Sequence, residues 1–266
     1  MKVGCIPICF LGELSEGRRP VEWWIDMACR IGLDGIEVYK PFVRPMDLPR
    51  LRQMSRLIEE TGLEVSMFTS YANFVSGKMD AEIESVKRDV DWAVVCGAGA
   101  VRVTAGGPLG PLSVEEAASR AAQGLRSCLD YAEERGVDLA LEDHPPFGSR
   151  IAEFLRILEL VDDARLKVNL DTSNPLPVRD DPVCLAQAVA ERVVHVHVSD
   201  RSPDMGHVQS GEGIVDLPSI FRILKRQGYD GWLSSEAGGP PTEDSIVRSA
   251  ANIRILWRGS GKSTTK

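Results

Sequence analysis

Short apolar runs alternate with longer amphipathic stretches along nearly the whole chain. Eight of the apolar runs are rich in strand-forming residues, which predicts β-strands, and the amphipathic stretches between them predict helices. The expected strands cover residues 2–9, 35–39, 63–68, 100–104, 137–142, 166–171, 193–198 and 231–236. The expected helices cover residues 20–31, 48–61, 80–96, 114–135, 149–161, 181–191, 216–227 and 242–257.

Eight strand–helix repeats in 266 residues fit a closed parallel barrel. We therefore expect a single (β/α)8 TIM barrel over residues 1–258, followed by a disordered polar tail over residues 259–266. An open, doubly wound sheet is the alternative for the same pattern. Turn chemistry supports the boundaries, because Ser113 and Glu116 form a capping-box pattern at the start of the helix expected at 114–135.

The parity of side chains along each strand separates those that face the barrel axis from those that face the helices. In the strand expected at 193–198, the valines share the face suited to packing under helices, and His195 and His197 share the inward face. The same count places Glu142, Asp171 and Glu236 on inward positions at the ends of their strands. Active sites of such barrels are assembled at these carboxyl ends.

Three carboxylates and one imidazole at one barrel mouth are a ligand set for a hard or borderline divalent cation. The set consists of Glu142, Asp171, His197 and Glu236. Without a cation, the three carboxylates would repel one another in a low-dielectric environment. The sequence therefore predicts a divalent-metal site, with Mn²⁺ as the expected ion and Mg²⁺, Co²⁺ and Zn²⁺ as alternatives.

Composition and charge exclude several other classes of protein. A formal net charge of −8 argues against a nucleic-acid surface, which needs a basic stripe. The chain has no apolar run of about 18 residues, so we expect no membrane span. Pro7 interrupts the first apolar run and no small-residue cleavage site follows, which favours a first strand over a secretory leader. Six cysteines without a C-x-x-C pair predict free thiols and a cytoplasmic location.

Six different short motifs follow one another along the chain, at or near successive expected strands. They are Gly-Ile-Glu-Val at 35–38, Val-Arg-Val at 101–103, Leu-Glu-Asp-His at 141–144, Leu-Asp-Thr-Ser-Asn at 170–174, His-Val-Ser-Asp at 197–200 and Gly-Glu-Gly-Ile-Val-Asp at 211–216. Together they resemble the xylose-isomerase-like barrels of the sugar phosphate isomerase/epimerase family, which include ketose 3-epimerases, hydroxypyruvate isomerase and inosose dehydratase. The resemblance runs from Lys2 to about Trp257.

The resemblance implies that the four predicted ligands hold one ion, and that Glu142 and Glu236 also flank the substrate and move protons. It implies a small carbohydrate substrate, with Arg201 near the position of a substrate-contacting basic residue. Inward parity and nearness to the motifs add other candidates for substrate contact. The candidates for substrate binding are Glu37, Arg102, His144, Asn174, Arg201 and His207.

Several of these residues have structural alternatives. Glu37 and Arg102 could pair with each other across the barrel, and His195 suits a packed layer beneath His197. His207 lies in a polar loop that is either solvated or closes over substrate. Asp200 is expected to support the site by bonding a ligand or a basic residue.

Asn174 departs from the family pattern, which often has histidine at this place after the sixth strand. An amide can bond a substrate hydroxyl but cannot ligate as an imidazole or shuttle a proton, which argues against a close relation to the ketose epimerases. The endonuclease branch of the superfamily is also disfavoured, because four histidines are too few for its trinuclear zinc site.

The chemistry expected of the site is proton removal next to a carbonyl, through an enediolate. Proton return gives an epimer or an isomer, and loss of a β-hydroxyl gives a dehydratase, so a lyase is an alternative. A non-catalytic sugar-binding subunit of a larger enzyme is a second alternative. Phosphate recognition has no support, because no Gly-rich loop leads into a helix after the last two strands, although Gly238 and Gly239 lie nearby. A homo-oligomer is possible.

Overall fold

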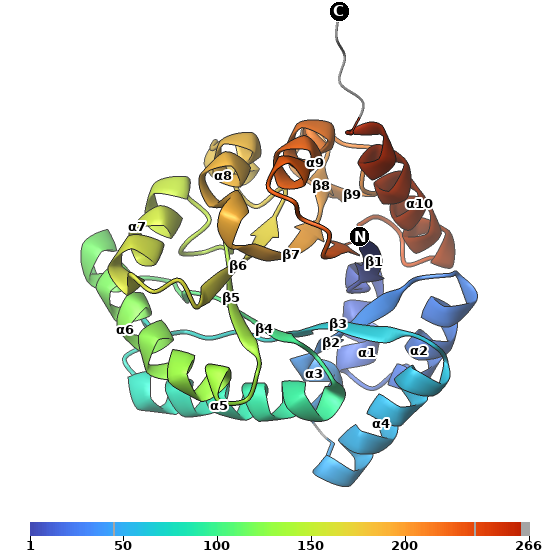
Figure 1. Ribbon diagram of the computed structural model, residues 1–266, viewed down its shortest axis with the longest axis horizontal. Helices are drawn as coiled ribbons and strands as arrows, with labels where there is room; N and C mark the ends of the chain where they lie inside the picture. The colour runs from blue at the N-terminus through green and yellow to red at the C-terminus, as the bar shows by residue number, and fades with distance from the viewer. Residues whose placement is uncertain (45, 237, 262–266) are drawn as a thin grey trace, which may run out of the picture.

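The computed structural model describes residues 1–44, 46–236 and 238–261, and its eight main strands form one parallel sheet rolled into a barrel (Figure 1). The strands follow the order β1-β10-β7-β6-β5-β4-β3-β2. Their bounds are Lys2–Cys5 for β1, Gly35–Tyr39 for β2, Glu64–Thr69 for β3, Ala100–Val103 for β4, Asp138–Glu142 for β5, Leu166–Asp171 for β6, Val193–Val198 for β7 and Trp232–Ser235 for β10. This architecture confirms the predicted TIM barrel and excludes the open, doubly wound sheet.

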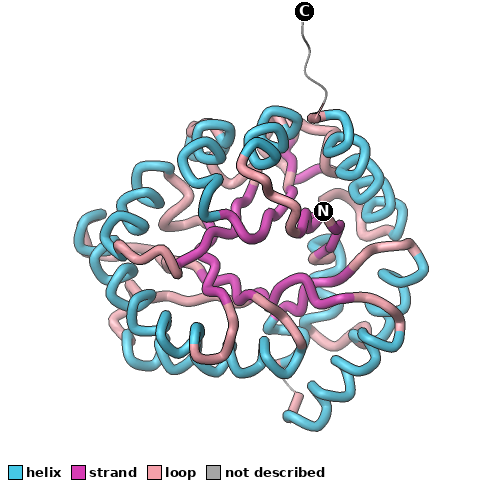
Figure 2. Tube along the Cα trace, in the orientation of Figure 1, coloured by secondary structure: helices cyan, strands magenta, loops and turns pink. Residues whose placement is uncertain are grey.

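The helices form a ring around the barrel, with the strands inside (Figure 2). Their bounds are Leu11–Ser15 for α1, Val21–Arg30 for α2, Lys40–Val43 for α3, Leu48–Glu60 for α4, Met79–Cys96 for α5, Val114–Glu133 for α6, Ile151–Val161 for α7, Pro182–Val189 for α8, Leu217–Arg226 for α9 and Glu243–Gly259 for α10. The capping box at the start of α6 is confirmed, since Ser113 accepts from the Glu116 N–H and the Glu116 carboxylate accepts from the Ser113 N–H.

The hydrophobic core lies between the strands and the helices, as the parity of the strands predicts. Val196 and Val198 of β7 are fully buried members of this core. His195 and His197 alternate with them and bond polar groups inside the barrel. The alternation therefore confines polar chemistry to the barrel axis and leaves an apolar layer under the helices.

Between β1 and β2 the barrel is closed by hydrogen bonds of one residue, Asp34. In the described part of the chain these two strands share no ladder, whereas every other neighbouring pair does. Asp34 precedes β2, and its N–H donates to the Val3 carbonyl at 3.0 Å. Its Oδ2 accepts from the Val3 N–H at 2.7 Å. One residue thus satisfies both backbone groups of Val3 at the seam.

Some expected boundaries are wrong. The first strand ends at Cys5 and not at residue 9, because Pro7 cannot donate to a ladder, and Ile8–Phe10 form a 3₁₀ turn that leads into α1. Neither α1 nor α3 was expected, since both are too short to show helical periodicity. A hairpin of β8 (Asp200–Arg201) and β9 (His207–Val208) was also missed.

The predicted polar tail begins inside helix α10, which continues to Gly259 and is followed by the buried Ser260. The part of that tail at 262–266 lies outside the described residues. Cys9, Cys29, Cys96, Cys128 and Cys184 are free thiols, as expected. None of the described helices has the length and apolarity that a membrane crossing needs.

Asp34→Ala is expected to lower the free energy of unfolding by about 1–3 kcal/mol, because the Val3 N–H would lose its acceptor at a part-buried site. Urea denaturation followed by circular dichroism measures the change. Asp230→Ala is the matched control: Asp230 lies in the turn before β10, is exposed, and its side chain forms no hydrogen bond or ion pair with a described residue. It should change stability by at most about 0.5 kcal/mol. Equal effects of the two substitutions would contradict the proposed role of the seam.

Candidate metal centre

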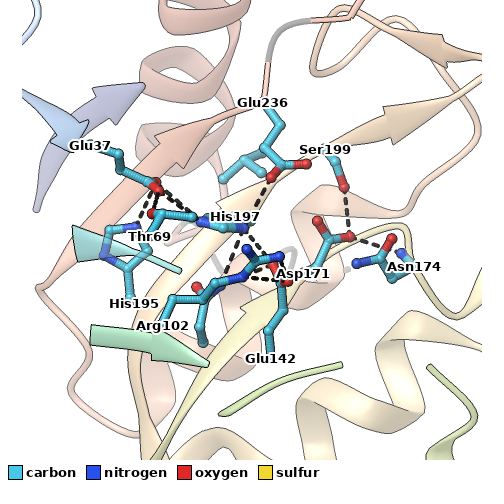
Figure 3. Close-up of polar contacts among 12 residues, drawn as sticks. Glu37, Thr69, Arg102, Glu142, Asp171, Asn174, His195, His197, Ser199 and Glu236 are labelled. Carbon is cyan, nitrogen blue, oxygen red and sulfur yellow. Dashed lines mark hydrogen bonds and ion pairs between the residues drawn. The ribbon is translucent and has the colours of Figure 1, made fainter. Parts of the chain in front are cut away.

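The four predicted ligands meet at the carboxyl end of the barrel (Figure 3). Glu142 and Asp171 are the last residues of β5 and β6. His197 is the last but one residue of β7, level with Asp171 in the β6–β7 register. Glu236 directly follows β10. One ligand atom from each of the four lies within 4.8 Å of the others. The barrel register therefore gathers residues that are up to 94 positions apart in the sequence (236 minus 142).

His197 lies at the centre of this group and divides it into two sides. Its Nδ1 is 2.5 Å from Glu142 Oε1 and 3.1 Å from Glu236 Oε1. Its Nε2 is 3.1 Å from an oxygen of Glu37 on the other side of the ring. When Nε2–H donates to Glu37, Nδ1 carries a lone pair directed at the carboxylates. This is the tautomer that a metal-binding histidine needs.

Glu37 lies beneath the predicted ligands and not in the substrate cavity. It is fully buried, and it bonds the ring nitrogens of both His197 and His195 as well as the hydroxyl of Thr69. Burial alone would raise the pKa of Glu37, but the two histidines lower it well below its usual value. The expected alternative of a Glu37–Arg102 pair is wrong, because both residues bond other partners.

A second possible ligand group contains Glu37, His195 and His197. His195 Nε2 donates to the Glu37 carboxylate at 3.1 Å and His195 is almost fully buried, which agrees with the packed inward layer expected for it. In this group Glu37 already serves both rings. We therefore assign Glu37 to orient His197 by a hydrogen bond, without ligating the ion itself. The group of Glu142, Asp171, His197 and Glu236 remains the candidate centre.

Arg102 holds the carboxylate of Glu142 inside the barrel. Its Nε donates to Glu142 Oε2 at 2.8 Å, and its Nη2 donates to the same oxygen. Its Nη1 donates to the Ser70 carbonyl at 3.0 Å, and the guanidinium lies 4.2 Å from the centre of the Tyr71 ring. Burial would raise the pKa of Glu142, but Arg102 and His197 lower it far below its usual value. Arg102 and His197 thus favour the ionised form of Glu142 in the resting site.

The cluster carries more negative charge than its own cations balance. Burial raises the pKa of Asp171 to about 7, and the charges of Glu236 and Glu142 add to the rise. Burial lowers the pKa of His197, but Glu37, Glu142 and Glu236 together raise it well above its usual value. Both shifts show that positive charge is favoured at this point. The oxygen-rich donor set, with one imidazole nitrogen turned toward it, fits a divalent cation.

Asp171 has one oxygen fixed and the other available. Its Oδ1 accepts from the N–H groups of Ser173 and Asn174 at 2.7 and 2.8 Å and from the Ser199 hydroxyl at 2.7 Å. Its Oδ2 bonds no side chain or backbone group of the described residues. Asp143, which was not predicted, accepts from the Asp171 N–H at 2.8 Å and is fully buried. The loop after β6 thus orients one oxygen of Asp171 toward the centre.

Asp143 is a buried acid without a counter-charge. Burial and the neighbouring Asp171 raise the pKa of Asp143 well above its usual value. Its Oδ2 lacks a hydrogen-bond partner among the described residues. The motif Leu-Glu-Asp-His contains Asp143, but strand parity gave no signal for it, because the residue follows the end of β5.

Asp200 has a different role from the expected one. Its two oxygens accept from the backbone N–H groups of Gly211, Gly213 and Val215 at 2.9–3.1 Å. A Cβ at Gly213 would lie 2.3 Å from the Arg201 carbonyl and from Asp200 Oδ1. The Gly-Glu-Gly motif is therefore a backbone loop wrapped around a buried carboxylate, and it bonds no predicted metal ligand.

A cavity of about 190 Å³ lies directly above the candidate centre. Five of the six predicted substrate-binding residues line it, together with Glu236; only Glu37 does not. The five are Arg102, His144, Asn174, Arg201 and His207. His207 reaches the cavity because the β8–β9 hairpin pairs it with Arg201.

The apolar part of the cavity wall was not predicted. Ile6, Ile8 and Leu11 contribute from the segment after β1, and Tyr71 contributes from the loop after β3. These residues carry no polar motif and lie outside the strands, where strand parity carries no information. The cavity therefore combines a polar floor with aliphatic and aromatic sides, as small-molecule sites do.

Comparisons with known proteins agree with this geometry. Fructoselysine 3-epimerase of Shigella flexneri is 27% identical over 239 residues, covering 82% of this chain and 86% of the relative. Inosose dehydratase of Geobacillus thermodenitrificans is 24% identical over 292 aligned positions, covering 97% and 96%. The crystal structure of the IolI protein with a bound zinc atom superposes with a TM-score of 0.82 at 17% identity, covering 98% and 99%. A model of the xylose isomerase-like TIM barrel family matches residues 25–256. The chain belongs to this family.

Proposed function

We propose that this protein is a divalent-metal-dependent isomerase or epimerase of a polyhydroxy ketone. The observation that carries the proposal is the position of Glu142 and Glu236, which approach the same nitrogen of His197 from two strands. In Figure 3 they come to the same edge of the His197 ring, Glu236 from above and Glu142 from below. Two carboxylates placed in this way can serve opposite faces of one substrate.

Glu142, Asp171, His197 and Glu236 would hold the ion. A bound divalent cation supplies Lewis-acid stabilisation of the negative charge that develops when a proton leaves a carbon next to a carbonyl. Glu37 keeps His197 in the tautomer that directs Nδ1 to the ion. Mn²⁺ is our preferred ion because three of the four ligands are carboxylates.

The two glutamates divide the work of proton transfer. Arg102 keeps Glu142 ionised, so in the resting site this carboxylate can only accept a proton from the substrate. Glu236 borders the cavity, and its side chain is 14% exposed, so it is accessible to both substrate and solvent. In one direction Glu142 accepts from one face and Glu236 delivers to the other, and in the reverse direction the roles exchange. Asn174, Arg201 and His207 bind the remaining hydroxyl groups.

Dehydration is a second candidate, because the inosose dehydratase relative aligns over nearly the whole chain. The same proton removal next to a carbonyl leads to loss of a β-hydroxyl if a proton reaches that hydroxyl. His144 borders the cavity and is not a predicted metal ligand, so its imidazole is the candidate for delivering this proton.

Metal analysis after Mn²⁺ loading should give about one ion per chain in the wild type and none in Asp171→Asn, because the free Oδ2 of Asp171 becomes part of a neutral amide. Inductively coupled plasma mass spectrometry measures the ratio. Asp143→Asn is the matched control: this neighbouring acid is outside the candidate ligand group, so the amide should retain the ion. A metal-free wild type would refute the assignment of the centre.

Glu37→Gln should weaken Mn²⁺ affinity roughly 10–100-fold, as loss of an outer carboxylate–histidine contact does in other metal sites. The amide can present its NH₂ group to His197 and so permit the wrong tautomer. Isothermal titration calorimetry measures the dissociation constant, and circular dichroism checks that the fold is retained. Unchanged affinity would show that Glu37 does not orient the ligand.

Incubation in D₂O with Mn²⁺ and a panel of ketoses and keto-inositols should introduce carbon-bound deuterium into at least one substrate. Glu142→Gln and Glu236→Gln should each slow this exchange by about 10²–10⁴-fold, the usual contribution of a general acid or base. Proton NMR and mass spectrometry measure exchange, and a product that has lost the mass of water would identify the dehydratase. Absence of deuterium across the panel would leave a non-catalytic sugar-binding role.

A further inference from the structure

A second, larger cavity of about 440 Å³ lies beside the one above the metal centre. Tyr71 lines both cavities, so one aromatic ring separates them. The second cavity lies where α3 meets α5, which are next to each other in Figure 1 and are joined by side-chain hydrogen bonds. Its other walls include Trp92, Ser85 and four charged residues.

Positive charge dominates this second cavity. Lys40, Arg44 and Arg88 line it, and Asp89 is the one acid among its lining residues. The formal charges of these four groups sum to +2, in a chain whose net charge is −8. A local excess of cations in an acidic protein attracts anions and repels the cations that the neighbouring centre binds.

The cations differ in how they are held. The Lys40 ammonium is fixed by Asp89 Oδ2 at 2.8 Å and by Ser85 Oγ at 2.9 Å, which leaves one of its three N–H donors free. Arg44 and Arg88 are exposed, and neither forms an ion pair with a described residue. Elsewhere on the surface, arginines such as Arg165 pair with two or three acids. The second cavity thus offers one anchored cation and two exposed guanidinium groups, of which Arg88 interacts electrostatically with Asp89 without a direct ion pair.

The two cavities are linked by bonded residues. Asp89 is buried and accepts from the Ser70 hydroxyl. The Ser70 carbonyl accepts from Arg102, whose guanidinium holds Glu142 of the metal centre. A chain of direct contacts therefore runs from Lys40 to Glu142. A ligand that occupies the first cavity and extends past Tyr71 would place its far end among the three cations.

We propose that the second cavity binds the phosphate group of a phosphorylated ketose whose carbonyl end lies above the metal centre. A phosphate monoester carries a charge of about −1.5 to −2 at neutral pH, which matches the formal +2 of the cavity better than a carboxylate does. Arginine forks also suit the planar pairs of phosphate oxygens. The location differs from the usual barrel phosphate site after the last two strands, where Gly238 and Gly239 lie. This inference rests on the proposed function for the carbonyl end of the substrate.

Direct binding of inorganic phosphate to the metal-loaded full-length protein, at constant ionic strength, tests the cavity by itself. We expect saturable binding by calorimetry, weakened at least about tenfold in the double variant Arg44→Ala/Arg88→Ala, since each lost charge-assisted hydrogen bond is worth about that factor. Arg56→Ala/Arg222→Ala is the matched control, because it removes two exposed arginines from α4 and α9 that pair with no described acid. It should bind phosphate like the wild type.

Equal phosphate affinity in the two double variants, or no saturable binding to the wild type, would overturn the inference. Acetate that binds as tightly as phosphate would overturn the phosphate assignment. Any contribution of the metal ion to phosphate binding is common to both variants and cancels in the comparison.

Exchange in D₂O then separates this inference from the proposed function. A neutral ketose and its phosphate ester, such as D-fructose and D-fructose 6-phosphate, serve as probes. The Arg44→Ala/Arg88→Ala variant should raise KM for the ester about tenfold with kcat unchanged, and should leave the neutral ketose unaffected. If the neutral ketose exchanges but the variant leaves the ester's KM unchanged, the inference fails and the function stands. If phosphate binds as expected but no ketose exchanges, the function fails and the phosphate site stands.

Discussion

The structure depends on how one buried imidazole is surrounded by carboxylates. His197 bonds Glu37 through one ring nitrogen and faces Glu142 and Glu236 through the other. Buried charges are costly unless they are paired, and removal of one partner leaves the other uncompensated. Arg102 neutralises one carboxylate. Burial raises the pKa of Asp171, and the charges of Glu236 and Glu142 add to the rise; burial lowers the pKa of His197, but the surrounding glutamates outweigh burial and raise it. The protein thus folds around a site in which carboxylates outnumber cationic groups, which favours the binding of a cation.

The barrel provides the precision that this arrangement requires. Parallel strands in register bring Asp171 level with His197, and Asp143 fixes the backbone of Asp171 from below. The segments after the strands shape the cavity. Asp200 accepts hydrogen bonds from the 211–215 backbone, and the β8–β9 hairpin places His207 at the cavity. Rigid strands hold the ligands, while the loops shape the space in which a substrate lies.

Two regions of opposite charge lie side by side at this mouth. The candidate metal centre is acidic, and the cavity between α3 and α5 is basic, with Tyr71 at the boundary. Opposite fields at adjacent positions orient a molecule that has a polarisable carbonyl at one end and an anion at the other. Ser70 and Arg102 connect the two regions by hydrogen bonds. A change in one region therefore bears on the other through a short path of buried polar contacts.

The sequence by itself determined the repeat of strands and helices, the barrel, and the inward position of Glu142, Asp171 and His197. These follow from local rules, because side-chain parity is fixed within each strand and strand ends coincide in a parallel barrel. Only the tertiary structure decided which partner each charged group takes. Arg102 pairs with Glu142 and not with Glu37, and Asp200 holds a loop instead of a ligand. The basic cavity also depends on tertiary contacts, because Lys40 and Asp89 are 49 positions apart and lie on different helices. Pairing of this kind depends on distances across the barrel, which neither periodicity nor composition records.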